Sequence, residues 1–575
     1  MFKRFFEYFH KYKRYLYLSA ACVIIETVFE MLIPVLMTDI IDVGLPNKDQ
    51  AFLLSQGLLM LLFALISMAS GILYARWSAI AGIGFASELR EAEFSKFMSF
   101  SFLNTDHFTT ASLVTRLTND ITVLQTTICG GMRPIVRGPI MFVVAIVTGI
   151  LVSPALSVVF FIAIPVLSFF LFLIVRKQRF MFRRIQQSLD RVNSFVQENL
   201  AAIRVVKSYV RGDYQCEKFD EINQEHKAVA TQAFHYSVLN QPLFQFVMYA
   251  TTIALLLLGG VLVRQNRLAV GQLTMFLSYV LMILNSLMLV SAVFLMFSRS
   301  AASASRIAEV LDEIPDIQDA SDPALKVAQG SIDFDHVYFK YTPSADEYVL
   351  SDISLHIHAG QTIGIIGGTG SAKTSLVQLI PRLYDISSGS LKIDGRDIKE
   401  YAVAHLREAV GMVLQKNTLF SGTVRDNLQW GDENASDADI MWACRIASAD
   451  AFINAMPKRL DTQLGQGGVN VSGGQKQRLC IARALLKKPR ILILDDTTSA
   501  VDTATEANIR AALAECMPHT TKLIISQRLS SVEGADQIVI LDNGTVKDIG
   551  THEELLKRSA YYRDIVETQK KGQEA

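Results

Sequence analysis

The sequence predicts an all-α membrane domain of six spans followed by an α/β domain of the P-loop class. Two observations lead to this division: long apolar stretches are concentrated before about residue 300, and a glycine-rich loop between a predicted strand and a predicted helix lies at 367–374. The chain has 575 residues, of which 50% are hydrophobic, so it is too long for one domain and too apolar for an ordinary soluble protein. Lysine plus arginine equal aspartate plus glutamate at 55 each, so no global basic field indicates a nucleic-acid partner.

Six apolar stretches are each long enough to cross about 30 Å of hydrocarbon. They lie at about 17–40, 53–75, 135–153, 155–175, 243–263 and 273–297. The amino terminus and the long segments between the second and third and between the fourth and fifth stretches are rich in Lys and Arg, whereas the first two short outer links carry almost none. We therefore expect a multi-pass protein of the plasma (inner) membrane, with the amino terminus, two long helical extensions and the α/β domain in the cytoplasm. Residues 1–15 are predicted to form an amphipathic helix at the membrane surface.

The glycine-rich loop has the groups that bind nucleotide phosphates. Consecutive backbone N–H groups, a lysine and a hydroxyl for Mg²⁺ are supplied by Gly367, Gly368, Thr369, Gly370, Ser371, Ala372, Lys373 and Thr374, with Ser375 following in the predicted helix. Glycine is expected where Ala372 stands, and if that position needs a positive φ, alanine costs about 1–2 kcal/mol. We expect a strained loop that still binds nucleotide; the alternative is a glycine-rich turn without a ligand.

Two further motifs lie downstream of the loop. The apolar run 491–494 predicts a strand buried on both faces that ends at Asp495, a residue placed to hold Mg²⁺ through water. Upstream, Ser472 and Gln475 have the spacing of a capping box at the start of a helix over 476–486. An ordinary helix cap is the alternative for any isolated Ser-x-x-Gln, but the position of this one, about twenty residues before the strand, favours a functional pair.

With these motifs the chain resembles the ATP-binding-cassette (ABC) family, and the resemblance implies ATP and Mg²⁺ as cofactors. Residues 367–374 correspond to Walker A, 491–495 to Walker B, and 471–475, with Ser472, Gly473, Gly474 and Gln475, to the signature that contacts nucleotide held by the opposing subunit. Tyr341 resembles the aromatic residue that stacks on adenine, although a core tyrosine at a strand end is the alternative. Thr374, Gln415 and Asp495 would serve Mg²⁺. Residues 499–502 resemble the loop that crosses the dimer interface.

Two positions depart from the family pattern. The family usually has a catalytic glutamate after Walker B, where this chain has Asp496, and a histidine that contacts the γ-phosphate, where this chain has Gln527. Shortening the side chain withdraws the carboxylate by more than about 1 Å, which can lower the rate about 10²-fold. Glutamine cannot carry a proton or a positive charge. Together the two changes resemble the slow, degenerate ATP site of bacterial heterodimeric multidrug exporters.

The resemblance implies one half of an exporter. The expected parts are a membrane domain over 1–305, a linker over 306–328 and a nucleotide-binding domain over 329–575. The expected partners are a second ABC half-transporter, membrane lipid and an amphiphilic, drug-like solute. The expected activity is that of a transport ATPase that hydrolyses ATP mainly at the partner's site. Two alternatives stay open: a homodimeric flippase for lipid or lipid-linked cargo, and a nucleotide-gated channel or regulatory subunit.

The membrane half contains three further candidate features. Residues 102–108 and 208–214, at the tips of the cytoplasmic extensions, are expected to be coupling helices by resemblance, with plain turns as the alternative. Glu26 and Glu30 share one face of the first span, and acids at membrane depth are functional candidates. They could attract a cationic substrate, lie near the surface, or pair with Arg133 or Arg137.

Overall fold

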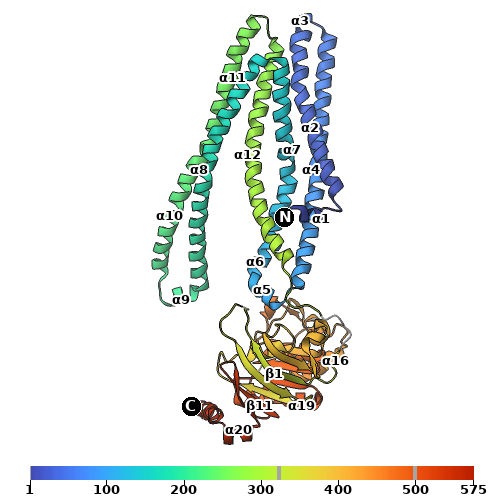
Figure 1. Ribbon diagram of the computed structural model, residues 1–575, viewed down its shortest axis with the longest axis vertical. Helices are drawn as coiled ribbons and strands as arrows, with labels where there is room; N and C mark the ends of the chain where they lie inside the picture. The colour runs from blue at the N-terminus through green and yellow to red at the C-terminus, as the bar shows by residue number, and fades with distance from the viewer. Residues whose placement is uncertain (1, 320–325, 343, 497–500, 575) are drawn as a thin grey trace. The chain divides into compact units, whose positions relative to one another are not determined.

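The computed structural model describes residues 2–319, 326–342, 344–496 and 501–574. Within helices only the backbone is described for residues 2–4, 171, 175, 179, 287–292, 294, 295, 298 and 570–574. The chain divides into two compact units, Met1–Met98 with Ala111–Asp312, and Ser99–Thr110 with Glu313–Ala575 (Figure 1). The described part of the first unit is helical and that of the second is predominantly α/β, so the predicted fold class is confirmed.

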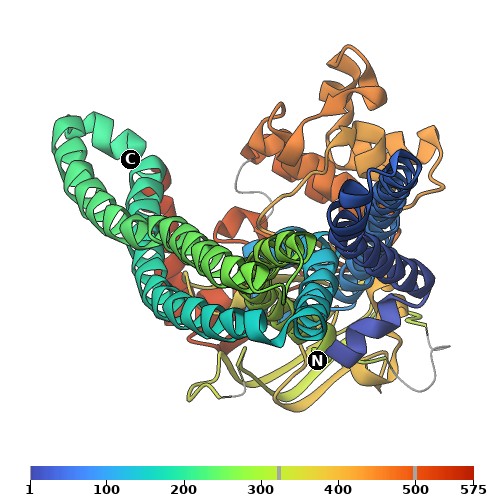
Figure 2. The same ribbon diagram turned by 90° about the horizontal axis from the view of Figure 1, so that it is seen from above.

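Long helices form the first unit. Their bounds, with those of the short helices that connect them, are α1 Phe2–Tyr8, α2 Lys13–Asp39, α3 Leu45–Asn47, α4 Gln50–Met98, α6 Thr110–Thr115, α7 Ile121–Val152, α8 Pro154–Ala201, α9 Ile203–Ser208, α10 Gly212–Val238, α11 Asn240–Arg264 and α12 Val270–Asp312. Single π-helical turns occur at Ile40–Gly44 and Arg116–Asp120. The helices α8, α10 and α11 diverge from the group formed by α2, α4, α7 and α12 (Figures 1 and 2).

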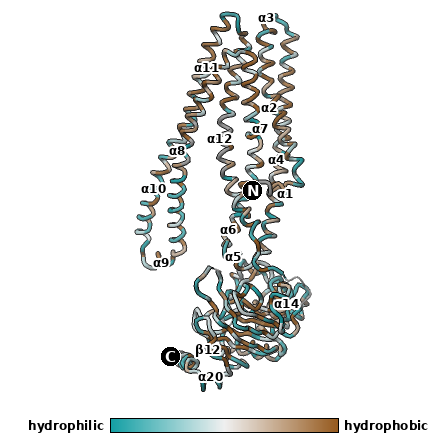
Figure 3. Tube along the Cα trace, viewed as in Figure 1, coloured by the Kyte–Doolittle hydropathy of each residue, from teal (hydrophilic) through white to brown (hydrophobic). Residues whose placement is uncertain are grey.

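Five stretches of the described chain are long and apolar enough to span a membrane. They are Lys13–Asn47, Gln50–Met98, Thr110–Val152, Pro154–Ala201 and Gly212–Arg264. The sixth expected span falls in α12, where Val270–Ser286 is a shorter apolar stretch and most side chains from 287 to 298 lie outside the described residues. The apolar residues of these helices gather toward one end of the unit, whereas α8 and α10 become hydrophilic toward their connection at α9 (Figure 3).

The two cytoplasmic extensions are continuous helices, as predicted, but the second tip differs from the prediction. The short helix at this tip is α9, which lies just before the expected segment 208–214, and α10 has already begun at Gly212. Between the two helices Val210 has a φ of 52°, which interrupts the helical conformation and forms a tight turn. The prediction of a coupling helix over 208–214 was therefore wrong in position, because the polar and aromatic cluster forms the turn and not the helix.

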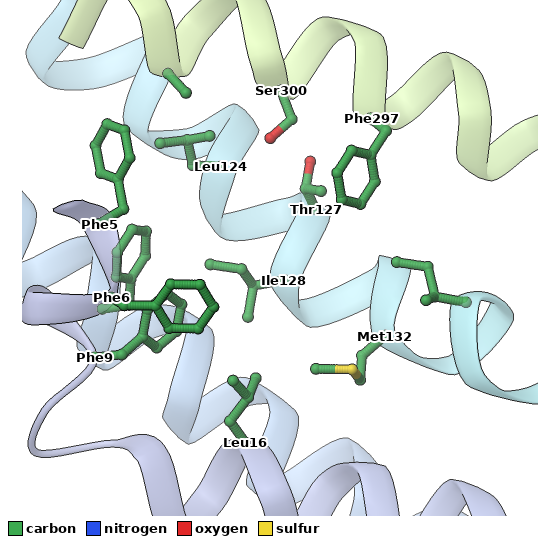
Figure 4. A pocket seen from close by; sticks show the side chains of 13 residues that line it. Phe5, Phe6, Phe9, Leu16, Leu124, Thr127, Ile128, Met132, Phe297 and Ser300 are labelled. Atoms are coloured by element: carbon green, nitrogen blue, oxygen red, sulfur yellow. The ribbon is translucent and has the colours of Figure 1, made fainter. Parts of the chain in front are cut away.

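The amino terminus forms a shorter helix than the predicted one over 1–15. Helix α1 ends at Tyr8, and α2 begins at Lys13. Phe5 and Phe9 are buried, and the Phe9 ring stacks on Phe85 of α4 with centroids 4.2 Å apart. These phenylalanines line an apolar pocket of about 230 Å³ that α2, α4, α7 and α12 complete (Figure 4). The aromatic face of α1 therefore fixes this helix against the spans.

Two larger sheets organise the described part of the second unit. A six-stranded sheet has the order β12-β11-β3-β10-β9-β6, and all its neighbouring strands pair in parallel except β11 with β12. A four-stranded antiparallel sheet has the order β2-β1-β4-β5, and β7 pairs with β8 in a two-stranded ribbon. The strands are β1 Ile332–Phe339, β2 Leu350–Ile357, β3 Thr362–Ile366, β4 Ser388–Ile393, β5 Arg396–Asp397, β6 Val410–Val413, β7 Gly422–Thr423, β8 Gln463–Leu464, β9 Ile491–Asp495, β10 Thr521–Ile525, β11 Gln537–Asp542 and β12 Thr545–Gly550.

Helices cover the sheets and bury their apolar residues in two clusters. The helices are α13 Lys373–Leu379, α14 Val403–Ala409, α15 Val424–Gln429, α16 Asp437–Ile446, α17 Asp450–Ala455, α18 Gly473–Leu486, α19 Thr503–Cys516, α20 His552–Arg558 and α21 Ala560–Glu574, with 3₁₀ turns at Ile398–Glu400, Arg459–Asp461, Gln466–Gly468 and Leu529–Ser531. The predicted strands at 362–366 and 491–494 are β3 and β9, whose apolar runs are buried as parallel strands require. Their carboxyl ends therefore lie at the same edge of the sheet, with β10 between them.

The first predicted coupling segment is a helix that packs on the α/β unit. Helix α5 spans Phe102–Phe108 and begins with a capping box between Ser101 and Asn104. The Asn104 amide donates to Glu313 over 2.7 Å, and the Tyr384 hydroxyl donates to Asp106 over 3.0 Å. A coupling role stays a prediction for this helix.

Candidate nucleotide-binding site

The glycine-rich loop joins β3 to α13, as the sequence predicts. Ala372, the last residue of the loop, has a φ of 69°, so it lies in the left-handed region where alanine is less stable than glycine. The expectation of backbone strain at this position is confirmed. The Lys373 ammonium donates hydrogen bonds to the carbonyls of Gly367 over 2.8 Å and Gly368 over 2.7 Å. Burial lowers the pKa of Lys373, and the nearby carboxylates of Asp496 and Asp495 oppose that change.

The geometry around Asp495 fits a divalent cation. Asp495 ends β9 and is 1% exposed, and its Oδ1 accepts a hydrogen bond from the Thr374 hydroxyl over 3.1 Å. Its other oxygen, Oδ2, is buried without a hydrogen-bond partner. A buried carboxylate oxygen without a partner is unfavourable unless a cation or water satisfies it. Burial also raises the pKa of Asp495, although the hydrogen bond from Thr374 opposes this change. Thr374 and Asp495 therefore supply the oxygen ligands that Mg²⁺ prefers.

Asp496 lies at the end of β9, one residue beyond Asp495. It has a φ of 48°, and its backbone N–H donates to the carbonyl of Ile525 in β10 over 2.9 Å. Its carboxylate accepts a long hydrogen bond from the Gln415 amide over 3.5 Å. Burial raises the pKa of Asp496, whereas Gln415 and Lys373 lower it. The backbone of Asp496 is therefore held by β10, and its carboxylate contacts the loop after β6.

Gln527 lies in the loop after β10, and a residue that the sequence did not indicate holds this loop. Gln569 of α21 donates from Nε2 to the carbonyl of Gln527 over 2.7 Å and accepts at Oε1 from the N–H of Leu529 over 2.8 Å. Tyr562 and Val566 on the same helix are buried in the apolar cluster that includes Leu529. The spacing of 562, 566 and 569 places them on one helix face. That spacing predicts a buried face, but no sequence signal connects it to the loop at 527.

The predicted signature residues lie at the exposed start of α18. The Ser472 side chain accepts from the Gln475 N–H over 3.3 Å, and the Gln475 side chain accepts from the Ser472 N–H over 3.0 Å. The predicted capping box is therefore confirmed. Gly473 and Gly474 form the first turn of the helix. This exposed turn leaves its backbone N–H groups accessible to a ligand.

Tyr341 is packed among aromatic side chains. Its hydroxyl is hydrogen-bonded to Ser375 over 2.8 Å, and its ring meets Phe339 and Tyr384 edge to face with centroids 4.9 and 5.1 Å apart. It is half-buried against the core of the unit. Stacking on adenine therefore stays a prediction for this residue.

One pocket brings most of the predicted residues together. Its volume is about 310 Å³. The predicted residues that line it are Thr369, Gly370, Ser371, Ala372, Lys373, Thr374, Ser375, Gln415, Asp495, Asp496 and Gln527. Tyr341 and the start of α18 are not among the lining residues. Of the predicted interface loop, Ser499 and Ala500 lie outside the described residues.

The pocket joins a phosphate loop, a buried carboxylate for a cation and a second carboxylate near the same lysine, all at the carboxyl edge of a parallel sheet. These features define a P-loop nucleotide-binding domain, carried here by a multi-pass membrane protein. Residues 16–287 match the family described as ABC transporter transmembrane region, and residues 350–499 match the family described as ABC transporter. The chain belongs to the ABC transporter family, with its transmembrane and ATP-binding domains fused in one polypeptide.

Similar proteins match along nearly the whole chain. An uncharacterized ABC transporter ATP-binding protein of Bacillus subtilis, YfiB, is 37% identical over 95% of this chain and 94% of its own length. A second uncharacterized ABC transporter ATP-binding protein, Rv1273c of Mycobacterium tuberculosis, is 33% identical over 98% of this chain and 97% of its own length. A solved structure of a bacterial Atm1-family ABC exporter with ATP bound has a TM-score of 0.83 at 23% identity and covers 97% of this chain and 99% of that chain. This last likeness shows that the fold is the exporter fold.

Proposed function

We propose that the chain is one subunit of a heterodimeric ABC exporter that moves amphiphilic, drug-like solutes out of the cell and carries a slow ATP site. The observation that supports this most is the position of Asp496 and Gln527, which both line the pocket beside Lys373. The two departures from the family pattern thus line the pocket that would hold the γ-phosphate and the attacking water. The membrane passage would be formed by 1–305, and 329–575 would bind ATP after a linker at 306–328.

An ABC ATP-binding domain binds ATP, normally with Mg²⁺, and half-transporters generally dimerise. Lys373 would neutralise phosphate charge, Thr374, Gln415 and Asp495 would hold the cation, and Tyr341 would contact adenine. The cation would polarise the phosphate oxygens. In hydrolysis a water oxygen attacks the γ-phosphorus, the bond to the β–γ bridging oxygen breaks, and a base accepts the proton from the water. Asp496 would be this base. Its side chain is one methylene shorter than that of glutamate, so its carboxylate would lie farther from the water.

The start of α18 supports a division of labour between the two sites. Ser472, Gly474 and Gln475 keep the signature pattern, and their exposed turn lies outside the pocket that contains Lys373. These residues would contact nucleotide held by the partner and complete a site that has its own glutamate and histidine. A homodimer would instead contain two impaired sites, which argues against the flippase alternative.

ATP turnover of the full chain with and without a co-encoded half-transporter tests this proposal. We expect substantial phosphate release only with the partner, loss of turnover when the partner's catalytic glutamate is replaced, and little change for Asp496→Ala in this chain. Ser472→Ala in this chain is the matched variant, and it should lower turnover because it acts at the partner's site. Full activity of this chain alone, abolished by Asp496→Ala, would instead support a homodimer with Asp496 as a working base.

A further inference from the structure

A cluster of four charged side chains lies inside the membrane-spanning region of the first unit. Glu26 of α2 forms ion pairs with Arg133 and, over 3.3 Å, with Arg137, both on α7. Arg137 also pairs with Glu30 over 2.6 Å. Among the alternatives for the two glutamates, the structure therefore shows the pairing with arginine. Glu26 and Glu30 lie about 14 and 20 Å along the helix from Tyr17, near the middle of a hydrocarbon core of about 30 Å.

Structural pairing alone does not account for this cluster. Ion pairs removed from water contribute little net stability, and charges at membrane depth are expensive. Glu26 is nearly fully buried, yet its Oε2 has no hydrogen-bond partner. An acceptor in that situation requires a donor that the described side chains do not supply.

The cluster lies at one side of a groove with an apolar wall. The groove is formed by α2, α4 and α7 and has a volume of about 590 Å³. Helix α4 contributes Met68 and Ile72 to the lining, and both side chains are exposed. Gly71 lies between them, and a Cβ at that position would stand 3.7 Å from the Glu26 carboxylate. The groove therefore combines charged groups from α2 and α7 with apolar side chains from α4, which is the pattern that an amphiphile matches.

The exposure of the charged groups indicates which headgroup fits. The Arg133 side chain is 45% exposed, whereas that of Glu26 is 4% exposed. An entering molecule thus meets a guanidinium group, which presents several N–H donors in a fork that matches phosphate or carboxylate. The Tyr74 ring lies 6.0 Å from the centre of this guanidinium and supports its orientation. The free oxygen of Glu26 would accept from a hydroxyl or ammonium group beside the anion.

We propose that the groove between α2, α4 and α7 binds an amphiphile whose headgroup carries a phosphate or carboxylate beside a hydrogen-bond donor, with Arg133 holding the anion and Glu26 the donor. This inference deepens the proposed export function, because such a molecule would be a substrate of the exporter. Binding itself needs no nucleotide. A failure of the ATP-site proposal therefore does not affect the binding measurement, and an absence of binding would not affect the ATP-site proposal.

Calorimetric titration of the full-length protein in an uncharged detergent, without nucleotide, tests the site. The ligands are dioctanoyl phosphatidylglycerol, dioctanoyl phosphatidylcholine, which lacks a headgroup donor, and inorganic phosphate. We expect saturable binding of the phosphatidylglycerol, weaker binding of the phosphatidylcholine and no comparable binding of phosphate. Arg133→Gln should weaken phosphatidylglycerol binding by about tenfold or more, because a charge-assisted contact is lost.

Three variants together separate this effect from misfolding. Arg133→Gln leaves Glu26 paired with Arg137, and Gly71→Leu keeps all four charges but fills the groove, so both should weaken binding. Arg267→Gln removes an exposed arginine outside the groove and should change nothing. Wild-type affinity in Arg133→Gln, or equal affinity for the two lipids, would overturn the proposal, because it would indicate unspecific lipid contact. Phosphate that binds as tightly as the lipid would also overturn it, in favour of a simple anion site.

Discussion

At the scale of single residues, we propose that Asp496 and Gln527 limit the rate of ATP hydrolysis in the pocket. Both lie around Lys373, and the position of Asp496 is fixed by its backbone bond to Ile525. With the backbone held in this way, a side chain one methylene shorter than glutamate would bring its carboxylate less close to the attacking water. Neither residue removes the phosphate loop or the cation ligands, and binding of ATP is retained in this account.

Restoring the family residues should therefore restore hydrolysis. In a complex whose partner has its catalytic glutamate replaced by glutamine, only this chain's site can contribute to turnover. We expect Asp496→Glu with Gln527→His to raise phosphate release by about tenfold or more. Asp496→Asn with Gln527→His is the matched control and should stay at the low level, because it adds the histidine without a base. Equal rates for the two double variants would show that the carboxylate is not limiting.

Sequence reasoning at this scale succeeded where a local motif determines the geometry. Strain was predicted for the loop at Ala372 because glycine is expected there, and Ser472 with Gln475 was predicted to cap a helix from their spacing. Tyr341 could not be predicted in the same way, because its contacts with Phe339, Tyr384 and Ser375 depend on the packing of separate segments.

At the scale of elements, helix α21 links the carboxyl-terminal segment to the loop at Gln527. Gln569→Ala removes both hydrogen bonds to this loop, so Gln527 should lose its defined position. We expect binding of ATP to weaken about three- to tenfold while binding of ADP is unchanged, since only ATP has the γ-phosphate. Equilibrium binding of the two nucleotides measures this difference. Gln569→Glu keeps the acceptor for Leu529 and should have a smaller effect. An equal loss for ATP and ADP would indicate general destabilisation instead.

The segment just before β1 is held by hydrogen bonds to one side chain, that of Asp394. Asp394 accepts hydrogen bonds from four consecutive backbone N–H groups at 328–331, at 2.8 to 2.9 Å. Burial acts to raise the pKa of Asp394, but these four donors outweigh it, and the pKa is lowered. The ionised carboxylate therefore stabilises the fold above its unfolded pKa of about 3.9, and this stabilisation is lost as the pH falls through the lower folded pKa.

Replacing this aspartate should accordingly destabilise the α/β unit in a pH-dependent manner. We expect Asp394→Asn to lower the free energy of unfolding by about 2 kcal/mol at pH 7. The difference from wild type should shrink below about pH 4, where the aspartate protonates. Thermal unfolding followed by tryptophan fluorescence at several pH values measures it. A difference that is constant from pH 7 to pH 3 would show that the charge of Asp394 is not responsible.

The elements themselves were predictable to different degrees. Buried parallel strands such as β3 and β9 are continuous apolar runs, and the spans are long apolar stretches, so both follow from the sequence. The short helix at the second tip was predicted at the wrong residues, because polarity alone does not distinguish the turn at Val210 from α9 before it. The two hydrogen bonds of Gln569 join positions about forty residues apart, and no periodicity reports such a contact.

At the scale of the whole molecule, the chain is an ABC transporter with fused transmembrane and ATP-binding domains, and we propose that its own ATP site binds ATP but hydrolyses it slowly. The fused domains and the family were predictable, because several motifs agree along one chain. The identity of the partner and of the solute does not follow from these motifs, since they determine the chemistry of ATP and not the lining of the membrane groove.

The most direct test of the central claim is which phosphates each subunit retains during turnover. Photoreactive 8-azido-ATP, radiolabelled at either the α- or the γ-phosphate, would be crosslinked to the complex of this chain with its partner after several turnovers. The account predicts that this chain retains both labels equally, because it holds unhydrolysed ATP, whereas the partner retains the α-label alone. Loss of the γ-label from this chain as fast as from the partner would contradict the account, because the site with Asp496 would then be a working catalytic site.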